Sequence, residues 1–118
     1  MKINKTDVRT ATIASGGNLS TPIEIEGAQI FGFIMPAEWT TANLTFKASD
    51  TFNGTYQDIY DDSGIEVSAT VAGQGICIGI SVAALALAGF NYIKIRSGTA
   101  AVPVNQAAAR VIKVNCKQ

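Results

Sequence analysis

Short runs in which apolar and polar residues alternate recur along this chain, and Gly, Asn, Asp and Pro separate them. An alternation with a period of two is typical of β-strands that bury one face, and the turn residues mark where each strand ends. The pattern predicts about nine strands, over residues 8–13, 22–26, 30–35, 44–49, 57–60, 66–71, 76–80, 92–96 and 110–115. We therefore expect an all-β fold, a jelly-roll-like antiparallel β-sandwich formed by residues 1–118 as one domain, with an N-terminal arm at residues 1–10.

The alternation also predicts which side chains lie in the core. Four of the runs have one apolar and one polar face, as expected for antiparallel strands with one side wetted by solvent. Their apolar faces consist of Ile23, Ile25, Leu44, Phe46, Ala48, Ile93, Ile95, Ile112 and Val114. Residues 30–35 and 76–80 are apolar on both faces, so they are either central strands or strands whose outer face meets another subunit. Gly32 and Gly79 leave gaps in these faces, which allow a bulge or a close approach of two backbones.

Two segments do not fit the strand pattern. Residues 81–88 are rich in Ala and Leu and leave two interpretations open. One is a helix of one or two turns that begins at Ser81 and stops at Gly89, and the other is a loop with a 3₁₀ turn. The loop is favoured, and at most one short helix is expected. Residues 97–109 are small and weakly polar and predict a long excursion before the final strand.

Charge is scarce in this sequence. Of the 118 residues, 47% are hydrophobic and only 15% are charged, whereas typical soluble domains contain about 25% charged residues. A surface so poor in charge favours a packed partner in an oligomer or a larger assembly. The nine basic and nine acidic residues cancel, so the chain lacks the basic field that nucleic-acid binding needs.

No segment is predicted to enter a membrane. The first ten residues are polar and lack the apolar run of an export signal. The longest apolar region, residues 76–90, is interrupted by Gly79, Ser81 and Gly89 and is too short to span a bilayer. We expect a protein that is made in the cytoplasm and that binds neither a membrane nor nucleic acid.

Catalytic residues do not occur at any recognisable spacing. The chain contains no histidine, and no serine lies in a Gly-x-Ser-x-Gly or Ser-x-x-Lys motif, so no nucleophile has an activating base. The sequence therefore predicts a protein that is not an enzyme and that needs no cofactor.

An acidic cluster of Asp58, Asp61, Asp62 and Glu66 offers the oxygen ligands that calcium prefers, but its spacing differs from that of the twelve-residue calcium loop. A turn between two strands, with Gly64 at positive φ, is the favoured interpretation. No metal site is predicted.

Cys77 and Cys116 are the only thiols. A disulfide between them is one interpretation, and two free thiols in a reducing cytoplasm are the favoured one.

Two sets of side chains are candidates for binding. The first is a candidate interface, made of the apolar residues Phe31, Phe33, Ile76, Ile78, Val102 and Val104. The second is a candidate aromatic platform for a sugar ring, made of Trp39, Tyr56 and Tyr60. Core packing is the favoured interpretation of these aromatic residues, because aromatic side chains on strands more often lie in the core.

Four segments together resemble one family. They are residues 35–46 (Met-Pro-Ala-Glu-Trp-Thr-Thr-Ala-Asn-Leu-Thr-Phe), 60–62 (Tyr-Asp-Asp), 95–99 (Ile-Arg-Ser-Gly-Thr) and 103–106 (Pro-Val-Asn-Gln). As a set they resemble small virion structural proteins of tailed bacteriophages and prophages, similar to the capsid decoration or cement proteins. The resemblance covers roughly residues 15–114.

This resemblance implies a non-enzymatic virion protein on the capsid surface. Proteins of this kind are commonly homotrimers that bind the major capsid protein over junctions between hexamers and stabilise the shell. Capsid contacts are then expected at the N-terminal arm and at residues 97–109. Two alternatives stay open, namely a carbohydrate- or host-surface-binding module of a tail or fibre, and a head-to-tail connector or other minor virion component.

Overall fold

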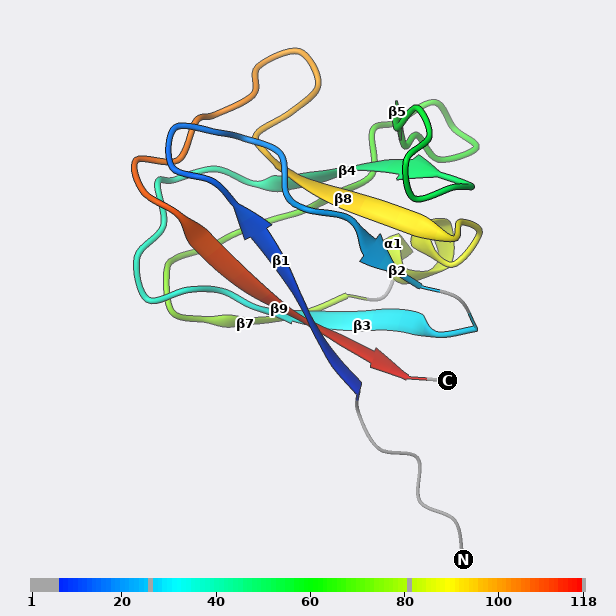
Figure 1. Ribbon diagram of the computed structural model, residues 1–118, viewed down its shortest axis with the longest axis horizontal. Helices are drawn as coiled ribbons and strands as arrows, with labels where there is room; N and C mark the ends of the chain where they lie inside the picture. The colour runs from blue at the N-terminus through cyan, green and yellow to red at the C-terminus, as the bar shows by residue number, and fades with distance from the viewer. Residues whose placement is uncertain (1–6, 26, 81, 118) are drawn as a thin grey trace, which may run out of the picture.

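The computed structural model describes residues 7–25, 27–80 and 82–117 of the chain. Within this part the chain forms nine strands and one short helix (Figure 1). In chain order the elements are β1 (Asp7–Ile13), β2 (Ile23–Glu24), β3 (Gln29–Ile34), β4 (Leu44–Ser49), β5 (Gln57–Asp58), β6 (Ser68–Ala69), β7 (Cys77–Gly79), α1 (Val82–Leu87), β8 (Tyr92–Ser97) and β9 (Arg110–Lys117). The nine predicted strands are confirmed, although β2, β5 and β6 keep only two residues each.

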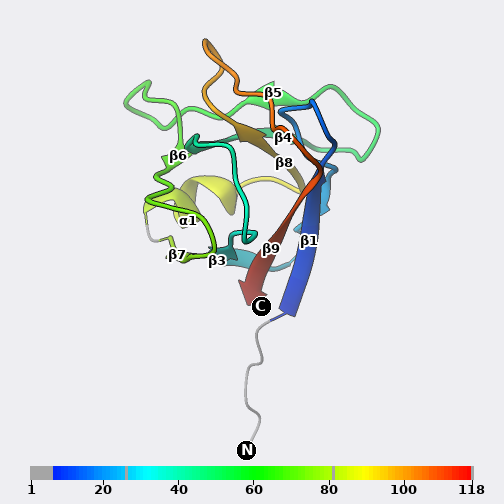
Figure 2. The same ribbon diagram turned by 90° about the vertical axis from the view of Figure 1, so that its left-hand side faces the viewer.

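The strands form two antiparallel sheets. Sheet A has the order β1-β9-β3-β7, and sheet B has the order β2-β8-β4-β5, with β6 also paired to β4. The sheets face each other as two layers (Figure 2), so the predicted β-sandwich is confirmed. The first and last strands are neighbours, since β1 pairs with β9 along its whole length, from Asp7 opposite Cys116 to Ile13 opposite Arg110.

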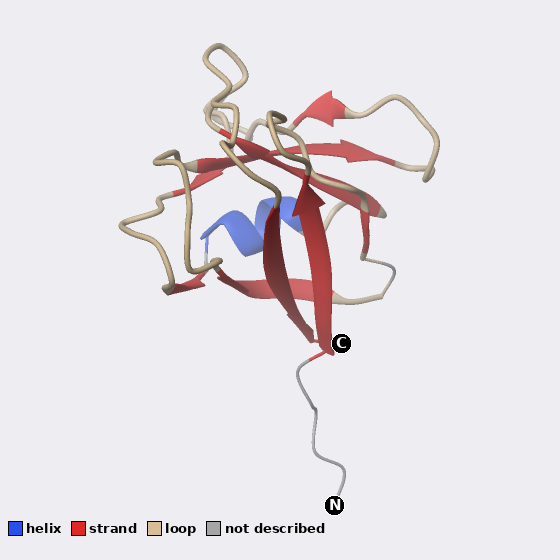
Figure 3. Cartoon of the chain, turned by 60° about the vertical axis from the view of Figure 1, so that its left-hand side comes forward, coloured by secondary structure: helices blue, strands red, loops and turns tan. Residues whose placement is uncertain are grey.

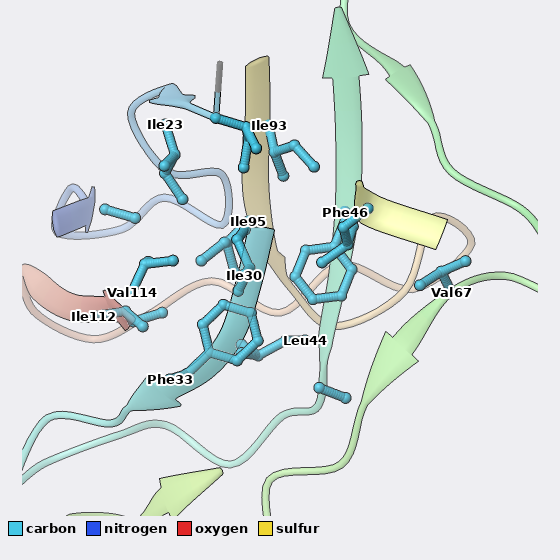
Figure 4. Close-up of a cluster of buried hydrophobic side chains, with 14 of the residues drawn as sticks. Ile23, Ile30, Phe33, Leu44, Phe46, Val67, Ile93, Ile95, Ile112 and Val114 are labelled. Carbon is cyan, nitrogen blue, oxygen red and sulfur yellow. The ribbon is translucent and has the colours of Figure 1, made fainter. Parts of the chain in front are cut away.

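The core lies between the two sheets (Figure 4). Phe33 of sheet A and Phe46 of sheet B stack across it, with ring centroids 5.8 Å apart and an angle of 19° between the rings. Every residue predicted from the alternation to face the core is buried, namely Ile23, Ile25, Leu44, Phe46, Ala48, Ile93, Ile95, Ile112 and Val114. The period-two pattern therefore identifies the inner face of both sheets correctly.

The outer face of sheet B is not wetted throughout, contrary to the prediction. Thr45 and Arg96 alternate with core residues of β4 and β8, yet they are only 1% and 6% exposed. Their partners come from distant segments, because Thr45 Oγ1 donates a hydrogen bond to the carbonyl of Gly98 and Arg96 binds Asp58 and Glu66. These segments fold over the strands and exclude solvent from them.

Helix α1 lies between the two sheets and contacts β3 (Figure 3). The side chain of Leu87 is fully buried there. The favoured loop for this segment is therefore wrong, and the helical alternative is correct. The helix forms because Ala and Leu have high helix propensity and because Leu87 is buried between the sheets.

A β-bulge interrupts the pairing of β3 with β9. The register shifts between Ile30 and Gly32, so Phe31 is the extra residue on β3. At Gly32 the backbones approach closely, because a Cβ atom there would lie 3.0 Å from the carbonyl oxygen of Ile78. Both features expected near Gly32 are therefore present, namely a bulge at the preceding residue and a close approach of two backbones.

The predicted N-terminal arm divides into two parts. Residues 7–10 belong to β1 and pair with β9 in sheet A, so they are not an arm. The first six residues of the predicted arm lie outside the described residues.

Candidate functional site

The outer face of sheet A carries exposed apolar side chains, and we call it the sheet A outer face. It contains the side chains that point away from the core on β1, β9, β3 and β7. These are Val8, Thr10, Thr12, Gln29, Phe31, Ile34, Cys77, Val111, Lys113, Asn115 and Lys117. Three apolar members are well exposed, with Val8 at 51%, Val111 at 47% and Phe31 at 43%. Such a group of exposed apolar side chains is typical of a surface that contacts a partner.

The charges on the sheet A outer face have one sign. Lys113 and Lys117 are exposed on β9, and no carboxylate of the described residues belongs to this face. Asp7 precedes Val8 on β1 but does not belong to this face, because it pairs with the inward-facing Cys116. Its carboxylate binds Arg9. A partner for this face would therefore be complementary if it presented carboxylates around an apolar centre.

A depression of about 290 Å³ lies in this face between β3 and β7. Gly32 and Gly79 are directly paired at its floor, so neither strand fills it with a side chain. At its margin Asn115 has a buried side-chain oxygen, Oδ1, that accepts no hydrogen bond from any described residue. Buried polar atoms are nearly always satisfied, so this oxygen marks a position where a donor from outside the chain would be stabilising.

The candidate interface residues occupy three different environments. Phe33 is 1% exposed and stacks on Phe46, so its assignment to an interface is wrong. The bulge at Phe31 explains this, because it turns Phe31 outward and places Phe33 on the inner face with Ile30. Ile76 and Ile78 are partly buried and pack against the core, so this face of β7 points inward and Cys77 points outward.

Val102 and Val104 belong to a small hairpin at residues 97–104. Thr99 N donates to Val102 O at 3.1 Å and Val104 N donates to Ser97 O at 2.8 Å. Gly98 has a φ of 92°, which the turn requires and which other residues rarely adopt. Val102 is 67% exposed at the tip, and Val104 is half-buried. The hairpin covers the outer side of sheet B, so these two residues do not extend the sheet A outer face.

The rest of the predicted excursion is anchored by Gln106, which is 1% exposed. Its Oε1 accepts from Thr40 N at 2.8 Å and from Arg110 Nε at 3.2 Å. Its Nε2 donates to Thr40 O at 3.0 Å and to Ser97 Oγ at 2.7 Å. Sequence reasoning missed this residue, because no local pattern indicates that a glutamine in a polar loop is buried.

The acidic residues considered for calcium have structural partners. Arg96 donates to Asp58 Oδ1 at 2.7 Å and to Glu66 Oε2 at 2.9 Å. Asp61 Oδ1 accepts from the backbone N–H groups of Ser63 and Ile65, and Gly64 has a φ of 78°. The predicted turn is therefore confirmed. Within the described ranges, no group of three or more His, Cys, Asp or Glu side chains could hold a metal ion.

The candidate aromatic platform does not form as predicted. Trp39 is 7% exposed, and its indole N–H donates to Ala42 O at 3.0 Å, so it is a core residue. Tyr60 is 53% exposed, but the ring contacts in the described part of the chain do not join it to Tyr56. The assignment of Trp39 to a binding platform is wrong, because its ring is needed for packing.

Tyr56 instead belongs to a cluster that sequence reasoning did not assemble. Its hydroxyl donates to Phe52 O at 2.8 Å, and the ammonium of Lys94 lies 4.4 Å from the centre of its ring. Phe52 packs edge-on against Tyr92, with ring centroids 5.9 Å apart. Partial burial, and secondarily the neighbouring Tyr92, raise the pKa of the Tyr56 phenol above its usual value. We call these four residues the aromatic–lysine cluster.

Both cysteines are free thiols, as favoured from the sequence. Cys77 is exposed and Cys116 is buried. Burial is the main cause that raises the pKa of the Cys116 thiol, while Arg9 opposes the shift and Asp7 adds to it.

No known protein family, curated protein or solved structure is significantly similar to this chain. Among the described residues, no helix is both long enough and apolar enough to cross a lipid bilayer.

Proposed function

We propose that this chain is a non-enzymatic structural protein of a tailed-phage virion. More specifically, it is a decoration protein that binds the capsid surface as a homotrimer and stabilises the shell. The single observation that carries the proposal is the sheet A outer face, with exposed apolar side chains, two lysines and no carboxylate among its described members. The choice of a phage capsid as the partner rests on the resemblance of four sequence segments to such proteins.

The chemistry of the sheet A outer face supports docking in three ways. Burial of the exposed side chains of Val8, Phe31 and Val111 against a partner would favour binding by about 25 cal/mol per Å² of apolar area removed from water. Lys113 and Lys117 form a one-sign pair that a carboxylate-bearing surface would complement. The orphan oxygen of Asn115 would gain a donor. A stable specific contact needs roughly 1,200 to 2,000 Å² of total buried surface, so the hairpin and other surfaces would share in the trimer.

The proposal is tested on the full chain by measuring its mass with light scattering, alone and with empty mature capsids of the phage that encodes it. We expect a trimer that co-sediments with the capsids. Val111→Asp places a carboxylate on the sheet A outer face and should abolish co-sedimentation. The matched control is Ile65→Asp, because Ile65 is 64% exposed and lies outside this face.

Two outcomes contradict the proposal. A monomer that leaves the capsids unbound removes both the trimer and the docking role. A ring of sixfold or twelvefold symmetry assigns the chain to a head-to-tail connector instead, whereas threefold symmetry favours decoration.

A further inference from the structure

The aromatic–lysine cluster lies on the outer side of sheet B, on the opposite layer from the sheet A outer face. Tyr92 and Lys94 alternate with the buried Ile93 and Ile95 of β8, so both point away from the core. Phe52 comes from the turn after β4 and is 54% exposed. The cluster therefore presents aromatic rings and a cation together on an exposed surface.

A second lysine lies beside Lys94 on the outer side of sheet B. Lys94 on β8 stands directly opposite Lys47 on β4, a like-charge pair that destabilises a sheet when nothing compensates it. Lys47 lies 4.0 Å from Asp58, but Asp58 also binds Arg96 at 2.7 Å. Glu66 also binds Arg96, and Glu24, which stands opposite Tyr92 on β2, forms no ion pair with Lys94.

Lys94 is the cation that these carboxylates do not reach. Among the described residues no carboxylate lies within 4.0 Å of its ammonium, and its contact is the face of the Tyr56 ring at 4.4 Å. A cation–π contact of this kind is a weak attraction between the ammonium and the face of the ring. It holds the side chain in place but leaves the positive charge unneutralised.

The loop that carries Phe52 and Tyr56 is fixed in advance. Ser49 Oγ donates to Thr51 O at 2.8 Å and accepts from Thr51 N at 3.1 Å, and the Tyr56 hydroxyl closes the loop on Phe52 O. A ligand that stacks on these rings would lose little affinity to ordering them. Two exposed asparagines are neighbours of these rings in sequence, since Asn53 follows Phe52 and Asn91 precedes Tyr92. Their side-chain amides can form hydrogen bonds with hydroxyl groups.

We propose that the aromatic–lysine cluster binds a saccharide that bears a carboxylate. The apolar face of a sugar ring stacks on the exposed aromatic side chains, and the sugar carboxylate binds the ammonium of Lys94. This inference is independent of the proposed function, because it uses the opposite layer of the sandwich. A neutral saccharide would leave Lys94 uncompensated, and the zero net charge of the chain disfavours a polyanion such as nucleic acid.

The test is a titration of the full chain followed by NMR, with two acidic probes and their uncharged counterparts. The probes are trigalacturonic acid against its methyl ester, and 3′-sialyllactose against lactose. We expect at least one acidic probe to bind about tenfold more tightly than its counterpart, because a charge-assisted hydrogen bond is about twice as strong as a neutral one. The shifts should map to residues 49–56 and 92–94.

Variants separate the two parts of the site. Lys94→Gln should remove the preference for the acidic probe, and Lys94→Arg should restore most of it. Phe52→Ala should weaken binding of both members of a pair, while Val102→Ala, a control on the distant hairpin, should change neither. Melting temperatures check that every variant is folded.

The proposal is overturned if the wild-type chain binds none of the four probes at millimolar concentration. It is also overturned if the acidic probe loses nothing in folded Lys94→Gln or in Phe52→Ala. Loss of capsid binding in the experiment on the sheet A outer face would leave this result unchanged, so failure of either proposal can be recognised separately.

Discussion

The side-chain amide of Gln106 pairs with the backbone of Thr40, 66 residues earlier in the chain, as if it were a strand neighbour. Thr40 N donates to the amide oxygen at 2.8 Å, and the amide nitrogen donates back to Thr40 O at 3.0 Å. One glutamine thus ties the segment after β3 to the segment before β9.

Replacement of Gln106 by Ala should lower the free energy of unfolding by about 2 to 4 kcal/mol, because buried groups of Thr40 and Ser97 lose their partners. Urea unfolding followed by the fluorescence of Trp39 measures this. Asn105→Ala is the neighbouring control, since Asn105 is exposed and its side chain accepts a hydrogen bond from the amide of Asn18. Its cost should be below about 1 kcal/mol. Equal costs for the two variants would show that the Gln106 amide is not a structural tie.

Arg96 should be the least replaceable charged residue. Arg96→Met leaves the carboxylates of Asp58 and Glu66 without their main partner, and breaking a buried ion pair in this way costs about 3 to 5 kcal/mol. Glu66→Gln keeps an acceptor for Ala100 N and should cost less. The double variant Arg96→Met with Glu66→Gln should cost less than the sum of the two single changes. Additive costs in urea unfolding would argue against a coupled cluster.

The two thiols should react at very different rates. Cys77 is exposed and Cys116 is fully buried with a raised pKa, so a thiol reagent at neutral pH should label one cysteine in the native protein and two in urea. Mass spectrometry of tryptic peptides identifies the labelled position. Cys77→Ser should show no rapid native labelling. Fast labelling of Cys116 without denaturant would contradict its burial.

Tyr56 should make stability fall at alkaline pH. Its pKa is raised in the folded state from a reference of 10.0, so the folded chain holds this proton more tightly than the unfolded chain. The contribution is fully present below pH 10.0 and is lost as pH rises through the folded pKa. Tyr56→Phe should cost about 1 kcal/mol at neutral pH, through loss of the hydrogen bond to Phe52. It should also reduce the slope of stability against pH above that point.

Tyr60→Phe is the control for this experiment, because Tyr60 is exposed and lies outside the aromatic–lysine cluster. Urea unfolding across the alkaline range compares the three proteins. An identical pH slope for wild type and Tyr56→Phe would contradict the prediction.

The sandwich and its core were predictable because the signal is local. Alternation in residues such as Leu44, Phe46 and Ala48 reports directly which face of a strand is apolar, and the structure buries all three. The burial of Thr45 and Arg96 could not be read in the same way, since it depends on segments that return over the sheet from elsewhere in the chain. Strand periodicity says nothing about what covers an outer face.

The candidate sites were harder to predict for the same reason. A single bulge at Phe31 turns Phe33 inward, whereas Phe31 stays exposed on the outer face. Tyr56 is one of the predicted platform residues, but its contacts are with Lys94 and Phe52 and not with Trp39 or Tyr60. Lys94 lies on β8, and the fold that brings it to Tyr56 cannot be read from local patterns in the sequence.

The short strands at the sheet margins affect how the protein behaves at high concentration. Four of the five outermost strands are short: β7 has three residues, and β2, β5 and β6 have two each. The fifth, β1, is longer, but Thr21 Oγ1 accepts a hydrogen bond from the amide of Thr12, and Arg9 binds the carbonyl of Glu24. Few backbone N–H and C=O groups at the sheet edges are therefore free to pair with a strand of another molecule. This disfavours fibril growth when the protein is concentrated.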